Sequence, residues 1–221
     1  MLTFRLTSMA LLTGAIAVSC AIPTRAEKPL PTTLSTSVSP MYQSGEIIGC
    51  QLEFQVVRSD PEYSDGRPVH ISGNLNFWVF EEKDPAVGLK LGVSEISKIY
   101  DKKPPFDAYL MNGYRTNISE QIGKSDGEGG SRIFGYKLGK LTSNVAFDDI
   151  IKNKKFTFSY SMIKEGLDAI VAVDLTVEKL DLENVEKSVV GDRTVKDWAE
   201  CISQTTDAEI ARLKVRGAAD N

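Results

Sequence analysis

His70 is the single histidine of the chain, so any imidazole chemistry must use it. Zinc, iron and copper sites that need two or more histidines are therefore excluded. A Ser–His–Asp triad would also depend on His70, yet its neighbours on the predicted polar strand face are Ser72 and Asn74, which are not acids. We expect His70 to be a surface residue on a solvated sheet face.

Acidic residues are the next candidates for chemistry. Glu53, Glu81 and Glu82 lie in or beside predicted strands, where a pair of carboxylates could hydrolyse a glycosidic bond. We favour a role against aggregation, because charged side chains commonly protect strand edges. The Asp-Gly-Glu-Gly stretch at 126–129 lacks the spaced acids of an EF-hand, which favours a loop over a calcium site. The sequence therefore predicts no catalytic residue, no metal site and no cofactor.

Residues 1–26 have the pattern of a bacterial export signal. Arg5 supplies a positive charge, residues 6–19 are uncharged and mostly apolar, and a Thr-Arg-Ala sequence ends the segment at Ala26. The apolar run is too short to span a bilayer comfortably. We expect cleavage of this leader and a periplasmic or secreted protein.

Lipid anchoring is an open alternative to this cleavage. Residues 17–20, Ala-Val-Ser-Cys, loosely resemble the lipobox of bacterial lipoproteins, in which Cys20 would become the lipidated first residue. Residues 27–44 are rich in Pro, Thr and Ser and are predicted to form a flexible linker, which would suit a tether. Without residues 1–26 the chain keeps 24 basic and 30 acidic residues. This negative excess argues against nucleic acid, and against a membrane partner unless Cys20 is lipidated.

The two remaining cysteines, Cys50 and Cys201, are predicted to form a disulfide. An exported domain with two cysteines in an oxidising compartment most simply pairs them. Closing a loop of about 150 residues lowers the conformational entropy of the unfolded chain, which in the chain-entropy treatment stabilises the fold by at most roughly 5 kcal/mol. No Cys-x-x-Cys spacing supports redox catalysis.

Hydrophobic residues alternate with a period of two through most of the chain, which is typical of half-buried strands. The pattern is clearest at 48–56, 69–79 and 87–93, and in a hairpin that turns at 164–166. These strands predict a mainly β fold, an antiparallel sandwich or barrel-like domain, with one or two short C-terminal helices. We expect the β-rich globular domain to span residues 45–204.

The other segments have weaker patterns. Residues 123–131 are glycine-rich and are predicted to form an exposed flexible loop, and residues 147–153 one helical turn. Helical spacing at 195–202 predicts a helix tethered by Cys201. Thr206 and Glu209 have the spacing of a capping box, so a second short helix and a tail are expected at 205–221.

Alternation places His70, Asn74, Asn76 and Trp78 on one polar face, where they could form a binding patch. We favour burial of Trp78 and Phe80 in the core instead, because strand register can slip by one residue. The leading hypothesis is a non-enzymatic envelope module that binds an unknown envelope protein or small ligand. A structural or assembly lipoprotein anchored through Cys20 is the alternative, and a hydrolase of envelope polymers is third.

Overall fold

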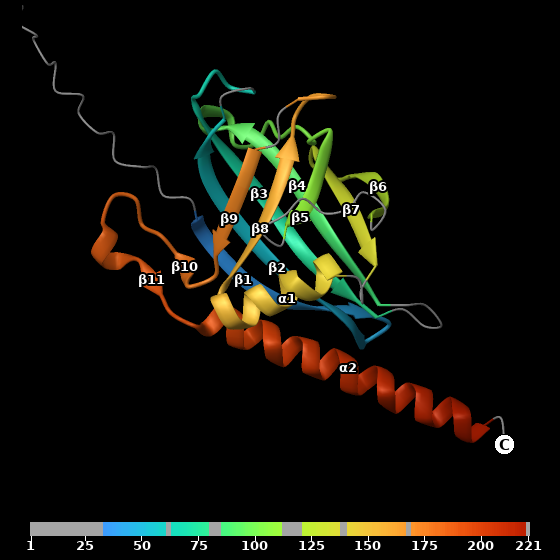
Figure 1. Cartoon of the computed structure of the whole chain (residues 1–221). Helices are drawn as coiled ribbons and strands as arrows, with labels where there is room; N and C mark the ends of the chain where they lie inside the picture. The colour runs from blue at the N-terminus through green and yellow to red at the C-terminus, as the bar shows by residue number, and fades with distance from the viewer. Residues whose placement is uncertain are drawn as a thin grey trace, which may run out of the picture.

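A computed structural model describes residues 33–60, 63–79, 85–111, 121–137, 141–166 and 169–219. Two antiparallel sheets pack face to face (Figure 1). In the eight-stranded sheet the order is β11-β10-β1-β2-β3-β4-β7-β6, and in the three-stranded sheet it is β5-β8-β9. The strands of the larger sheet are β1 (Thr33–Gln43), β2 (Glu46–Ser59), β3 (Pro68–Trp78), β4 (Ala86–Glu95), β6 (Gln121–Gly127), β7 (Ser131–Lys137), β10 (Val177–Lys179) and β11 (Val189–Val190).

The smaller sheet and the helices complete the fold. Its strands are β5 (Asp107–Met111), β8 (Lys155–Ser161) and β9 (Ala169–Asp174). Two α-helices, α1 (Leu141–Asn153) and α2 (Arg193–Ala219), lie at one end of the sandwich (Figure 1). Short 3₁₀ turns are η1 (Ile96–Lys98) and η3 (Val185–Lys187). The predicted mainly β, antiparallel sandwich is confirmed, and the helical content is larger than expected.

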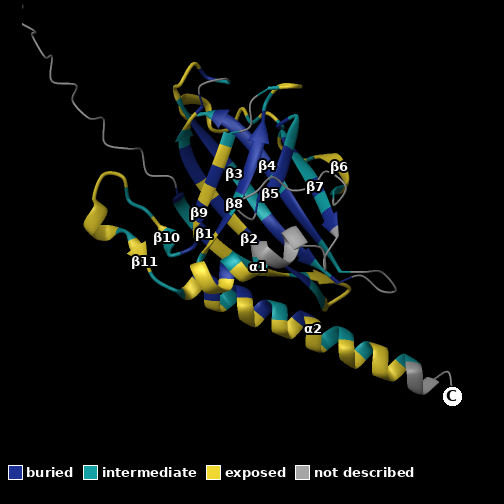
Figure 2. Cartoon of the chain, viewed as in Figure 1, coloured by how far each residue is buried: buried dark blue, intermediate teal, exposed yellow. Residues whose placement is uncertain are grey.

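The core lies between the two sheets, and Figure 2 shows the buried residues concentrated on their strands. Phe54 of β2 meets two rings of β8, with ring centroids 5.2 Å from Phe156 and 5.5 Å from Phe158. Burying such side chains contributes roughly 1.5–3 kcal/mol each, which makes this interface the main source of stability. The side chains on one face of each central strand therefore pack in the core, and those on the opposite face point away from it.

The expected flexible linker at 27–44 is wrong from residue 33 onward. Residues 33–43 form β1, which is hydrogen-bonded along β2. The hairpin between them turns on Ser44 and Gly45, which both have positive φ, as a two-residue hairpin loop requires. The strand can be polar because one of its sides faces solvent. On the inner side the Thr36 hydroxyl is satisfied, since it donates a hydrogen bond to the Val177 carbonyl oxygen (2.9 Å). Residues 27–32 lie outside the described residues.

Two further expectations change. Residues 121–127 and 131–137 form the β6–β7 hairpin, so most of the expected loop at 123–131 is strand. The two expected C-terminal helices are one continuous 27-residue helix, α2. Thr206 lies within it and donates a hydrogen bond to the Ile202 carbonyl oxygen (2.8 Å), four residues back, instead of capping a new helix. Helix α1 has 13 residues instead of one turn.

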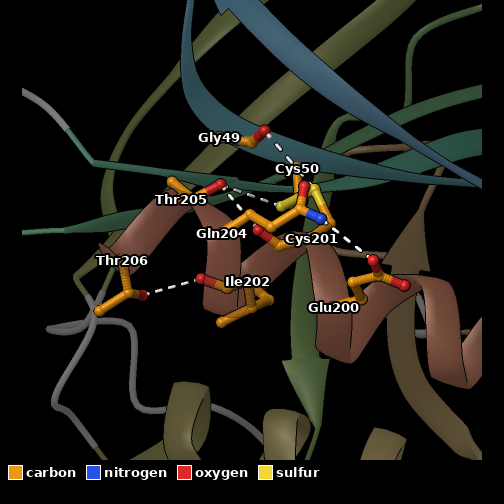
Figure 3. The surroundings of a disulfide bond; sticks show 8 residues. All are labelled: Gly49, Cys50, Glu200, Cys201, Ile202, Gln204, Thr205 and Thr206. Carbon is orange, nitrogen blue, oxygen red and sulfur yellow. Dashed lines mark hydrogen bonds between the residues drawn. A yellow bond between two sulfur atoms is a disulfide. The ribbon is translucent and has the colours of Figure 1, made fainter. Parts of the chain in front are cut away.

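The predicted disulfide joins β2 to α2 (Figure 3). Cys50 and Cys201 have sulfur atoms 2.09 Å apart, and both residues are buried. The Thr205 hydroxyl donates to the Cys201 carbonyl oxygen (2.9 Å) and lies 3.4 Å from Cys50 Sγ. Trp198, one turn earlier, is only 1% exposed and packs near the Phe147 ring of α1. The disulfide holds α2 to the larger sheet, and the aromatic contact holds it to α1.

No helix in the described part of the chain is long and apolar enough to cross a membrane.

Candidate functional site

The outer face of the eight-stranded sheet carries the polar residues that alternate with the core. On β3 these are the even-numbered residues, whose cross-strand partners include Gln51 and Glu53 on β2 and Lys90 on β4. Directly opposite residues of an antiparallel pair project on the same face. The predicted patch residues His70, Asn74, Asn76 and Trp78 therefore share this face, but they are spread along the whole strand.

A polar hollow of about 360 Å³ opens on this face. Of the predicted patch, only Asn74 lines it. Its lining combines hydroxyls, amides, backbone and four charged side chains: Ser35, Ser37, Glu53, Phe54, Gln55, Ser72, Gly73, Asn74, Lys90, Lys102, Glu128, Gly129 and Ser131. No aromatic side chain projects on this face from those positions, because Phe54 points into the core.

Two neighbouring rows of residues form the floor of the hollow. In the first row Asn74 pairs with Glu53 on one side and with Lys90 on the other. In the second row Ser72 pairs with Gln55 and with Gly92. The acidic side of the floor is thus on β2 and its basic side is on β4, with neutral polar groups between them.

Glycines leave room for the two lysine side chains. A Cβ at Gly92 would lie 3.2 Å from Lys102 Cδ, and a Cβ at Gly127 would lie 3.3 Å from Lys90 Cε. Lys102 reaches the face because Lys103 forms a bridge to Val93, with Lys103 N donating to the Val93 carbonyl oxygen (2.7 Å). The methylene stems lie against the sheet, and the ammonium groups are left at the hollow.

Most polar side chains of the hollow have no protein partner in the part of the chain that the structure describes. Among the described residues, neither Lys90 nor Lys102 forms an ion pair. Ser72 and Asn74 likewise make no side-chain hydrogen bond within the described ranges. Glu53 is engaged on one side, where Gln51 Nε2 donates to its Oε1 (2.5 Å). These groups are therefore free to bind water or a polar ligand.

His70 lies on the same face as the hollow, two residues before Ser72 on β3, and is buried. The residue is only 8% exposed, so the expectation of a surface histidine is wrong. The cause is the chain after β4, which packs η1 against β3 at this end. His70 Nε2 donates to Gln55 Oε1 (3.2 Å), which leaves Nδ1 buried with no hydrogen-bond partner in the described structure. Burial and the nearby charge of Lys102 lower the pKa of His70, so the ring is neutral at pH 7.

Trp78 lies at the other end of the same face. The expectation that it belongs to the core is wrong, because its indole is half-buried on the outer face, over Gly88. A Cβ at Gly88 would lie 2.3 Å from Trp78 Cη2, so the ring rests directly on the glycine. Asn76, between Trp78 and Asn74, is 5% exposed, and its Oδ1 has no partner among the described groups. Phe80 lies outside the described residues.

Among the described residues, the acidic stretch at 126–129 does not form a metal site. Asp126 is paired with Arg132, with Nη2 to Oδ1 at 2.7 Å, which occupies the acid that a calcium site at 126–129 would need. No group of three or more metal-binding side chains occurs within the described ranges. Glu81, Glu82 and Cys20 lie outside those ranges.

The sequence prediction missed Glu53, Lys90 and Lys102 as members of one site. Lys90 could have been found, because it is the single charged outward position in a strand whose other outward residues are Ala86, Gly88, Gly92 and Ser94. Lys102 lies in an irregular segment, and no local pattern places it over Gly92. Chemically, the arrangement offers two ammonium groups, two carboxylates and several neutral hydrogen-bonding groups to one small ligand.

No protein-family model, curated protein or solved structure matches this chain.

Proposed function

We propose that this protein is an exported binding module that holds a small polar ligand in the hollow on the outer face of β1–β4. The observation that carries the proposal is a set of polar groups that have no partner among the described residues and gather over one concave surface, with Lys90, Lys102 and Asn74 at its centre. Small-molecule sites are concave and contain a few convergent polar groups that fix the ligand.

The rigidity of the floor supports this role. Asn74 and Lys90 project from adjacent strands in the middle of the sheet, whose inner face is fully packed. Side chains on such strands are held more firmly than those on loops, which lowers the cost of ordering them on a ligand. The neutral state of His70 keeps a third positive charge away from the same place.

A binding panel tests the proposal. Isotope-labelled protein is titrated with glucose, glucuronate, glycine, glutamate and citrate, and backbone amide shifts are followed by NMR. We expect at least one solute to shift the amides of Asn74, Lys90 and Lys102 in a saturable way. The variant N74A should weaken that binding, and K187M should not, since Lys187 is an exposed residue of η3 and does not line the hollow. Shifts confined to other surfaces, or none, would contradict the proposal.

Export is the second part of the proposal. It is supported by the leader pattern at 1–26 and by the disulfide, which is stable in an oxidising compartment. Intact mass of the protein from its native envelope distinguishes the two leader products. A chain that starts at Glu27 supports a free exported protein, and a chain that starts at an acylated Cys20 supports a tethered lipoprotein.

A hydrolase is a second candidate, because Glu53 and Glu128 both line the hollow. Two carboxylates at one site are what glycoside hydrolysis requires. Incubation with purified envelope polymers would show new reducing ends if the protein cleaves them. The variant E53Q should abolish that release, whereas a purely binding protein would give none before or after the substitution.

A further inference from the structure

The hollow has a defined polarity, which constrains its ligand. Glu53 is on β2, Asn74 is on β3, and Lys90 is on β4, so the acid and the base are two strand spacings apart. At about 4.8 Å for each spacing, their backbones are roughly 10 Å apart. Lys102 adds a second ammonium group on the β4 side through its position over Gly92.

Neutral groups that both donate and accept hydrogen bonds line the hollow on both sides of Glu53. Ser35 and Ser37 lie beyond the acid on β1, and Ser72 and Asn74 lie between the acid and the lysines. A ligand that fills this space must offer several hydroxyl or amide groups of its own. A carboxylate such as that of Glu53 accepts hydrogen bonds from two neighbouring hydroxyls, because it has two oxygen atoms.

The basic side requires an anionic group on the ligand. The ammonium groups of Lys90 and Lys102 have no acidic partner within 4 Å in the described chain. Glu128, on the turn between β6 and β7, also lines the hollow and weakens the positive field without pairing with either lysine. An anion placed between the lysines would gain two charge-assisted hydrogen bonds.

We infer that the ligand is an acidic sugar, with its carboxylate between Lys90 and Lys102 and its ring hydroxyls on Glu53 and Asn74. This inference rests on the proposed binding function of the hollow. A free α-amino acid fits less well, because its two charges are attached to neighbouring carbon atoms while the hollow separates its acid from its bases by a whole strand. A sugar ring carries the anion on one side and hydroxyl donors on the other.

Calorimetric titration of the disulfide-bonded protein at pH 7.5 tests the inference, with glucuronate and glucose as matched probes. We expect glucuronate to bind at least about tenfold more tightly than glucose, a difference of about 1.4 kcal/mol. The double variant K90M/K102M should reduce glucuronate binding to the level of glucose. E53Q should weaken the binding of both sugars. E128Q should strengthen the binding of glucuronate alone, and K187M should change the affinity for neither sugar.

The outcomes separate the ligand class from the general function. Equal binding of glucose and glucuronate, or a glucuronate affinity unchanged in K90M/K102M, would overturn the acidic-sugar assignment and leave the binding function standing. Binding of glycine or glutamate at the hollow without either sugar would do the same. If neither sugar binds and no member of the wider panel shifts the hollow amides, both proposals fail. Far-UV circular dichroism of each variant shows that a loss of binding is not a loss of folding.

Discussion

Asn74 of β3 and Lys90 of β4 are direct cross-strand partners on the outer face of the larger sheet. Their pairing places an amide beside an ammonium group that has no ion-pair partner in the described structure. Antiparallel neighbours of this kind are fixed by the ladder and by the packed core beneath them. The hollow is therefore a consequence of the same register that builds the core.

Gly88 is needed because the Trp78 ring lies on it. In G88A the new Cβ would lie 2.3 Å from Trp78 Cη2, so the ring must move. We expect a loss of about 1–3 kcal/mol in the free energy of unfolding and a shift in tryptophan fluorescence. Urea denaturation measures the first effect.

G123A is the matched control for that substitution. Gly123 lies on the same outer face, two strands away, and a Cβ there meets no atom within 4 Å. Its effect should stay within about 0.5 kcal/mol. Equal stability of the two variants would show that Trp78 does not depend on Gly88.

The disulfide should contribute strongly to stability. The double variant C50S/C201S removes the covalent link between β2 and α2, which joins two residues separated by 151 positions in the sequence. We expect the free energy of unfolding to fall by about 2–5 kcal/mol, measured by urea denaturation. The disulfide-bonded protein in the same urea series is the reference. An unchanged midpoint in C50S/C201S would mean that the noncovalent contacts of α2, such as the packing of Trp198 and the hydrogen bond from Arg212 to the Ile47 carbonyl oxygen, hold the helix without the disulfide.

The buried pair of Asp60 and Tyr160 should also be sensitive. The Tyr160 hydroxyl donates to Asp60 Oδ2 at 2.6 Å, and the Asp60 residue is buried. Y160F removes this donor from a buried carboxylate, which should cost about 1–3 kcal/mol. Thermal and urea unfolding measure the loss. Y42F, at an exposed tyrosine, should have no effect; equal stability of both variants would contradict a structural role for the hydrogen bond.

His70 gives a pH dependence whose sign follows from its environment. Its pKa in the folded protein is lowered by burial and by the charge of Lys102, relative to about 6.5 in the unfolded chain. Below pH of about 6.5 the unfolded chain binds the proton first, so stability falls as the pH drops towards the folded-state pKa. H70Q should lose less stability than the native protein between pH 7.5 and pH 5, as measured by thermal unfolding.

The same histidine reports on Lys102 directly. Because the chain contains one histidine, its ring protons give an unambiguous NMR titration. K102M should raise the pKa of His70, since it removes a neighbouring positive charge. An unchanged titration in K102M would contradict the placement of Lys102 beside the hollow.

Much of the fold follows from local sequence pattern. Strands β2, β3 and β4 were predicted because large apolar residues alternate in each of them, and the pairing of Cys50 with Cys201 followed from counting cysteines. Strand β1 was missed because it is rich in Ser and Thr, lacks alternating large apolar residues and owes its order to pairing with β2. The break expected at Thr206 does not occur, because its hydroxyl bonds within the helix.

The candidate site was only partly predictable for a different reason. Asn74 was found because alternation along one strand assigns it to the polar face. Its neighbours Glu53 and Lys90 come from two other strands, and only the register between strands brings them together. Lys102 is positioned by a bridge between Lys103 and Val93, an irregular contact without a sequence signature. His70 was predicted to be exposed because nothing next to it in the sequence indicates burial. The segment that covers it, η1, follows β4 and is distant from His70 in the chain.

A crystal structure of the protein with its tightest-binding panel solute would test the central claim most directly. The prediction is density for that solute in the hollow, with an oxygen atom within hydrogen-bond distance of the Asn74 amide and of Lys90 or Lys102. Density at any other surface, with the hollow filled only by solvent, would contradict the claim that this face of the sheet is the binding site.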